Sequence, residues 1–140
     1  MGATVVEAEW AVFGVGDARM ALPAHALREV LPLPEVRRSL QGSMAFRGTM
    51  TYRGGLVPVL SGRLLMGQPP SVNRARNRPF WAPEIHVPHE LAVVVQHHGR
   101  VLVVAVDTVV GMEARPWGAR PFHLGELASL CPSPRVAQAG

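Results

Sequence analysis

Histidines and one cysteine are the residues in this sequence that could hold a metal ion or act as a nucleophile. Four histidines lie within a short stretch, at His86, His89, His97 and His98. Pro88 interrupts the helix that would align the first two as metal ligands. Cys131 precedes a proline and has no paired histidine motif of the kind that activates a thiol. We therefore expect no metal site and no nucleophilic cysteine.

Glycine and serine motifs for phosphate or acyl chemistry are not evident either. Gly14-Val15-Gly16 and Gly54-Gly55 lack the spacing of a dinucleotide or Walker loop. No serine stands in a nucleophile elbow. The sequence therefore predicts a protein that is not an enzyme and has no catalytic residues and no cofactor.

A basic and aromatic stretch at residues 74–81 offers a different chemistry. Three arginines at alternate positions precede Phe80 and Trp81, a pattern that could stack nucleic-acid bases. The net charge is only +4, and all 14 basic residues are arginine, whose high pKa raises the isoelectric point without a strong field at neutral pH. We favour a solvated loop here. A small nucleic-acid-binding barrel that uses this loop stays as the alternative function.

Length and composition limit the kind of protein that must position these residues. A chain of 140 residues fits one domain, and 48% apolar residues against 17% charged residues exclude disorder throughout. No apolar run approaches the roughly 20 residues of a membrane helix, and no signal peptide is evident. A single cysteine excludes an intramolecular disulfide, which fits the cytoplasm. We expect no direct membrane insertion.

The pattern of apolar residues predicts short strands and very little helix. A strand at 9–15 should be buried on both faces and return through 19–22. Leu27, Val30 and Leu31 have helical spacing and predict a short helix that opens at Pro23. They could line a groove for a partner helix or simply pack in the core. The other expected elements are an irregular connection at 35–48, strands at 49–52 and 56–60, and a helical turn at 61–66.

The second half of the chain alternates between proline-rich and strongly apolar segments. Residues 67–89 contain five prolines and predict an extended, exposed loop. The strongest hairpin follows, with strands at 91–95 and 101–106, and 109–112 should add another strand. Pro58 places the 56–60 strand at a sheet edge or bulge, and 122–130 predicts a short helix. The whole pattern favours an all-β protein, built as small barrels or a sandwich.

The order of several motifs resembles the CheW family, the coupling proteins of bacterial chemosensory arrays. A first strand ends in Phe13-Gly14-Val15-Gly16-Asp17, and Leu27-Arg28-Glu29-Val30 follows. The most specific match is the stretch from Thr51 to Arg63, which contains Arg53-Gly54 and Val57-Pro58-Val59. An apolar strand that closes on Val106-Asp107-Thr108-Val109 completes the series.

The resemblance implies two intertwined five-stranded barrels with a groove between them and no catalysis. It implies binding to the cytoplasmic tips of chemoreceptors and to the regulatory domain of the histidine kinase CheA. Seven residues match family elements linked to partner contact or to the loop beside the receptor groove: Leu27, Glu29, Val30, Arg53, Gly54, Pro58 and Arg63. An exposed Arg53 could bind a receptor carboxylate through two hydrogen bonds.

Three departures from the family pattern shape the remaining expectations. Thr51 and Ser61-Gly62 replace the usual residues, and the 67–89 loop is longer than usual. No terminal strand-and-helix pair is recognisable after Arg115, so we expect one incomplete barrel, weakened kinase coupling and an open edge through which two copies could form a homodimer. The expected division is a tail at 1–8, a CheW-like domain at 9–114 and a short C-terminal segment at 115–140.

Overall fold

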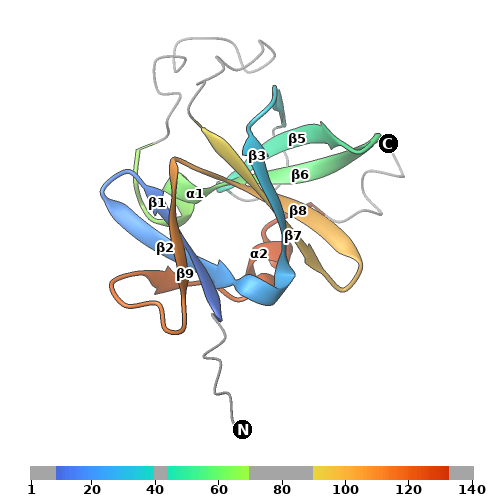
Figure 1. The fold of residues 1–140 in the computed structure, drawn as a ribbon. Helices are drawn as coiled ribbons and strands as arrows, with labels where there is room; N and C mark the ends of the chain where they lie inside the picture. The colour runs from blue at the N-terminus through green and yellow to red at the C-terminus, as the bar shows by residue number, and fades with distance from the viewer. Residues whose placement is uncertain (1–8, 40–43, 70–89, 133–140) are drawn as a thin grey trace, which may run out of the picture.

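The computed structural model describes residues 9–39, 44–69 and 90–132 (Figure 1). Strands dominate, and they form two mixed sheets. The four-stranded sheet has the order β10-β2-β1-β9, with β1 (Trp10–Val15), β2 (Ala18–Pro23), β9 (Thr108–Glu113) and β10 (Arg120–Pro121). The six-stranded sheet has the order β3-β7-β8-β6-β5-β4, with β3 (Leu27–Pro32), β4 (Arg37–Arg38), β5 (Phe46–Tyr52), β6 (Gly55–Ser61), β7 (Leu91–His97) and β8 (Arg100–Val106).

Among the residues that the structure describes, helix is confined to three short pieces, η1 (Ala24–Ala26), α1 (Gly62–Leu65) and α2 (Leu124–Ser129). The expected all-β fold with little helix is therefore confirmed. Within the described residues, backbone pairing closes neither sheet into a barrel, because each order ends in strands that pair on one side only.

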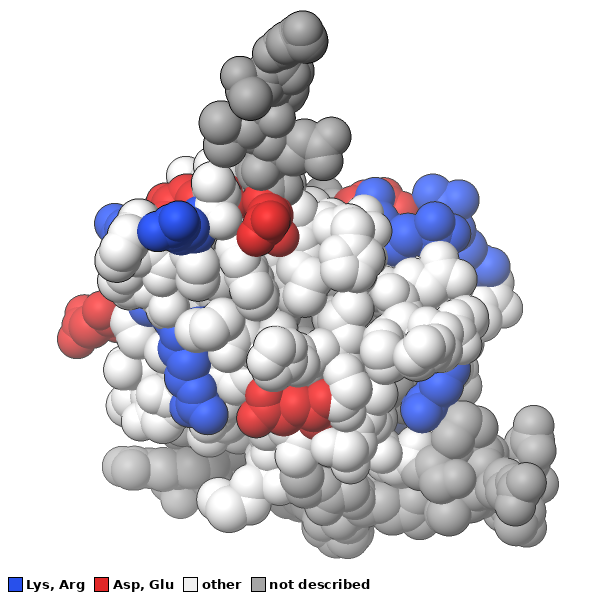
Figure 2. Space-filling model, turned by 90° about the horizontal axis from the view of Figure 1, so that it is seen from below, with Lys and Arg blue, Asp and Glu red and all other residues white. Residues whose placement is uncertain are grey.

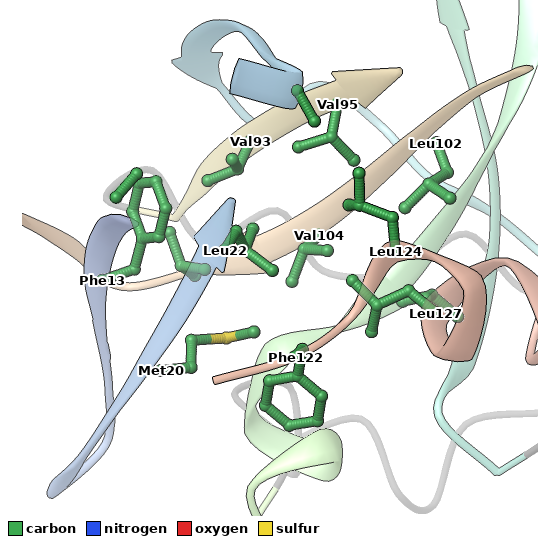
Figure 3. Packing of buried hydrophobic residues seen from close by; sticks show 14 of the residues in the cluster. Phe13, Met20, Leu22, Val93, Val95, Leu102, Val104, Phe122, Leu124 and Leu127 are labelled. Atoms are coloured by element: carbon green, nitrogen blue, oxygen red, sulfur yellow. The ribbon is translucent and has the colours of Figure 1, made fainter. Parts of the chain in front are cut away.

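The hairpin of β7 and β8 is a wall shared by two hydrophobic cores. Alternate residues of a strand point to opposite faces, so Val93 and Val95 face the first core while Ala92 and Val94 face the second. The first core lies between this hairpin, β1, β2 and α2, with Phe13 and Phe122 among its fully buried side chains (Figure 3). The second core is enclosed by the six-stranded sheet. This double burial explains the near-continuous valine and leucine run of both strands.

The β5–β6 hairpin and the β7–β8 hairpin each close with a two-residue turn in which both residues have positive φ. Arg53 and Gly54 have φ of 50° and 81°, and His98 and Gly99 have φ of 50° and 78°. This geometry matches the right-handed twist of the flanking strands, and the second position is glycine because it carries no Cβ. The hairpins expected around Arg53-Gly54 and at His97-His98-Gly99 are confirmed.

The helix expected from Pro23 through Leu31 is wrong beyond its first turn. Only η1 is helical, and Leu27–Pro32 is strand β3, which pairs antiparallel with β7. The segment between Pro23 and Pro32 is too short for a stable helix, and pairing with β7 satisfies the backbone of Leu27–Pro32 instead. The helical spacing of its apolar residues was a coincidence of composition.

Other parts of the predicted order need smaller corrections. The connection expected to be irregular contains β4 and the start of β5. Pro58 lies on β6, which is an interior strand rather than an edge, but pairing with β8 begins only at Val59, so one flank of Pro58 has no partner strand. The strand at 109–112, the turn at 61–66 and the helix within 122–130 are confirmed. Most of the 67–89 loop lies outside the described residues.

The C-terminal segment contributes more than expected. The two residues of β10 pair parallel with Met20 and Ala21 of β2, and α2 then packs Leu124 and Leu127 into the first core. A terminal strand and helix therefore do exist after Arg115. Two residues give almost no periodicity, which is why the sequence pattern did not reveal the strand.

Candidate protein-binding site

Glu29, Tyr52 and Arg53 form one hydrogen-bonded group on the surface, here called the Glu29 cluster. The Tyr52 hydroxyl donates to Glu29 Oε2. Arg53 donates from Nη2 to the same carboxylate oxygen at 3.1 Å and from Nε to the Tyr52 hydroxyl at 3.0 Å. The three side chains therefore hold one another in a fixed arrangement.

The cluster joins parts of the sheet that are far apart in strand order. Glu29 lies on β3, at one end of the six-stranded sheet, while Tyr52 ends β5, next to the other end. The sheet must curl for these side chains to touch, as sheets of strongly twisted strands do. We call this junction the seam, and side chains rather than backbone hydrogen bonds bridge it at the Glu29 cluster.

A second arginine–glutamate pair ties β5 to the start of β7. Arg47 donates from Nη1 to Glu90 Oε2 at 2.9 Å and from Nη2 to Oε1 at 3.0 Å. The two side chains are 9% and 3% exposed, respectively. The paired geometry matches the guanidinium fork to both carboxylate oxygens, so this buried contact is strong and directional. It holds β5 in the position from which Tyr52 reaches Glu29.

Exposure separates the Glu29 cluster from that buried pair. The Arg53 side chain is 76% exposed and Glu29 is 36% exposed. The Tyr52 hydrogen bond, followed by the Arg53 hydrogen bond, holds the pKa of Glu29 below its usual value. Glu29 therefore stays ionised at neutral pH, and Arg53 presents its charge to solvent while it is already paired. A partner carboxylate must share Arg53 with Glu29 or displace it.

Two residues of the site were missed by sequence reasoning. Tyr52 was part of the motif comparison but received no role, although it bonds both Glu29 and Arg53. Leu56 follows the Arg53-Gly54 turn and is 65% exposed, which gives the turn an apolar neighbour. A large apolar residue two positions after the turn glycine Gly54 was the available signal for Leu56.

Leu27 and Val30 are partly buried residues that contribute to the core and also reach the surface. Both lie on β3, are half-buried and pack against the first core. Leu27 is paired with Val95 and Val30 with Val93. Their packing role is therefore established, and contact with a partner through their exposed parts stays a prediction.

Arg63 belongs to a different junction from the Glu29 cluster. It donates from Nε to Asp107 Oδ1 at 3.2 Å and from Nη2 to Oδ2 at 2.8 Å, and Oδ2 also accepts from the Gly16 amide at 2.6 Å. A Cβ at Gly62 would lie 2.5 Å from the Ala105 carbonyl oxygen, so glycine allows α1 to pack directly on β8. This junction ties the turn after β1 to α1 and to the start of β9.

The candidate reactive groups show no catalytic arrangement where they are described. Among residues 9–39, 44–69 and 90–132, no group of three or more His, Cys, Asp or Glu side chains could hold a metal. Burial raises the pKa of the Cys131 thiol to about 11, so little thiolate forms at neutral pH. Desolvation, then the charges of His98 and Arg100, lowers the pKa of His97. His86, His89 and the arginines of 74–81 lie outside the described residues.

Surface charge is dispersed on the face seen in Figure 2. Arginines and acidic residues alternate around an uncharged centre, with no continuous basic strip among the residues shown in colour. In the described part of the chain, no helix has the length and apolarity to cross a membrane.

Comparisons with known proteins agree with this picture. The family model for the CheW-like domain matches residues 9–119. The fold is similar to the crystal structure of the scaffolding protein TtCheW from Thermoanaerobacter tengcongensis, with a TM-score of 0.56 at 16% identity, over 75% of this chain and 63% of that one. This chain therefore spans less than two thirds of that relative. No curated protein matches the chain. The length of the family match shows that the chain belongs to the family of CheW-like domains.

Proposed function

We propose that this chain is a non-enzymatic adaptor of a bacterial chemosensory pathway that binds chemoreceptor cytoplasmic tips in the cytoplasm. The observation that carries the proposal is the CheW-like match over residues 9–119. It agrees with a fold whose described residues place an exposed, pre-ordered arginine at a tight turn. The proposed working unit is the CheW-like domain at residues 9–114, whose first core is completed by the C-terminal residues Phe122, Leu124 and Leu127.

The proposed receptor contact is centred on the Glu29 cluster. Arg53 is exposed, yet its hydrogen bonds to Glu29 and Tyr52 already restrict its conformers, which lowers the entropy cost of binding. Leu56, which is paired with Thr51, adds an exposed apolar group to the same hairpin. An amphipathic helical tip with a carboxylate near an apolar residue fits this pairing. Gly54 and Pro58 are proposed to shape this hairpin, and Leu27 and Val30 to contact the partner from the other face of β3, where they also pack on the first core. Arg63 is proposed to support the site from the Asp107 junction.

Calorimetric titration with a purified receptor cytoplasmic hairpin tests this proposal. We expect the wild-type chain to bind and Arg53→Glu to lose binding, because the variant places a carboxylate where the partner's carboxylate must approach. Arg19→Glu is the matched control, since Arg19 is an exposed arginine on β2 and carries the same charge change. No binding by the wild-type chain, or equal losses in both variants, would contradict the proposal.

Coupling to the histidine kinase CheA is proposed to be weaker than receptor binding. The supporting feature is the two-residue length of β10, which leaves most of the outer edge of β2 without a partner among the described residues. A pull-down with the CheA regulatory domain should recover little of this chain compared with the same assay on a relative with a longer final strand. Equal recovery of the two proteins would reject weakened coupling.

We further propose that two copies of the chain associate through an open sheet edge. An edge strand exposes backbone donors and acceptors that another strand can satisfy. The free edges of the two sheets support this proposal.

A further inference from the structure

Four strands end the two sheets, and they are not equivalent as edges. Both β4 and β10 have only two residues, too few to pair stably with another chain. The third end strand, β3, is already bridged across the seam by Tyr52 and Arg53. The fourth, β9, has six residues and pairs with β1 on one side only within the described chain. It is the long edge that these contacts leave open.

Strand β9 also exposes several large apolar side chains to solvent. Val109, Val110 and Met112 are 54%, 39% and 53% exposed. Between Thr108 and Met112 the strand contains no charge and no proline, two features that protect an edge from pairing. A third such feature is present as a one-residue bulge, because Gly111 pairs with Val12 and Val109 with Phe13, which leaves Val110 without a partner on β1. Continuous apolar exposure along an open edge indicates a surface that is covered when the protein works.

The residue order of β9 is self-complementary in the antiparallel direction. A two-fold axis between Val110 and Gly111 places Val109 opposite Met112 of the second copy and Thr108 opposite Glu113. Apolar residues then meet apolar residues, and a hydroxyl meets a carboxylate at each end. A parallel pairing would set Glu113 against Glu113, and like charges directly opposite destabilise a strand pair.

We propose that β9 is the dimer interface of this protein, and that two copies join antiparallel through it into one continuous eight-stranded sheet. This inference rests on the proposed self-association and identifies the edge that carries it. Asp107 does not add repulsion at the strand's start, because Arg63 already pairs with both of its oxygens. One added strand pair is a small interface, so the dimer should be weak and depend on concentration.

Sedimentation equilibrium of the full chain tests the proposal. The average mass of the wild-type protein should rise from 15.1 kDa toward twice that value as concentration increases. Val109→Glu should raise the dissociation constant about tenfold or more, because it buries a charge against Met112. Leu56→Glu, the same change at an exposed apolar residue of another hairpin, should leave the dissociation constant unchanged. A wild-type mass independent of concentration, or equal effects of the two variants, would overturn the proposal.

Cysteine cross-linking covers the case in which Val109→Glu disturbs the fold. In a Cys131→Ser background, the pair Val109→Cys and Met112→Cys should give disulfide-linked dimers on mild oxidation, while Leu56→Cys should not. Equal cross-linking of both would overturn the assigned edge. Receptor binding measured on the Val109→Glu chain should match the wild type, so the loss of dimers and the loss of adaptor function remain separate results.

Discussion

Two arginine–glutamate pairs involve residues of β5 and its turn, and they differ mainly in exposure. The Arg47 and Glu90 side chains are 9% and 3% exposed, whereas those of Arg53 and Glu29 are 76% and 36% exposed. Water screens the exposed pair, so the fold gains little from it, while the buried pair has no solvent to replace a lost partner. The same two residue types therefore stabilise the fold at one end of β5 and, in the function proposed above, contact a partner at the other.

The largest effect expected from this contrast is the loss of Arg47. Arg47→Ala should lower the free energy of unfolding by about 3–5 kcal/mol, because Glu90 would remain buried without its main counter-charge. Urea unfolding followed by circular dichroism measures the change. The double variant Arg47→Met, Glu90→Leu should recover most of the loss, since it removes both charges. A loss below about 1 kcal/mol for Arg47→Ala would contradict a structural role.

A third pair, Arg63 with Asp107, is intermediate in solvent exposure between the Arg47–Glu90 and Arg53–Glu29 pairs. Its side chains are 25% and 15% exposed. Arg63→Ala should cost about 1 kcal/mol, and Asp107→Ala should cost about 1 kcal/mol more because the Gly16 amide also loses its acceptor. The same urea experiment measures both. Equal losses would mean that the Gly16 hydrogen bond adds nothing to the junction.

The sequence pattern predicts the β7–β8 hairpin correctly, but it does not predict the contact between β3 and the end of β5 at the seam. The β7–β8 hairpin has long apolar strands and a His98-Gly99 turn, so the residues of this segment alone predict both its strands and its connection. The misassigned strand β3 has apolar residues at helical spacing, and only pairing with β7 reveals it as a strand. The contact of Tyr52 with Glu29 depends on the curl of a six-stranded sheet, which no local pattern encodes.

A small pH effect should separate the exposed pair from the buried one. Because hydrogen bonds from Tyr52 and Arg53 lower the pKa of Glu29, its stabilising contribution is fully present above its usual value of 4.5 and is lost as pH falls through the lowered value. Carboxyl chemical shifts in an NMR titration should place the Glu29 midpoint below that usual value. Tyr52→Phe should move the midpoint upward, since it removes the larger cause. A midpoint unchanged by Tyr52→Phe would contradict this assignment.

The smallest effect on stability is expected at Arg53 itself. Arg53→Ala should leave the urea midpoint within error of the wild type, because the side chain is largely in water. Arg19→Ala, at an exposed position on β2, provides the reference for a neutral surface change. A marked loss of stability in Arg53→Ala alone would show that the seam depends on this arginine.

The charge-swapped variant Glu29→Arg, Arg53→Glu tests most directly whether Arg53 serves binding rather than the fold. The swap keeps opposite charges across the seam but reverses the charge at the turn that a receptor would meet. Binding to a receptor cytoplasmic hairpin should be lost in the swap as fully as in Arg53→Glu, while the urea midpoint of the swap stays that of the wild type. Recovery of receptor binding in the swap would contradict the account.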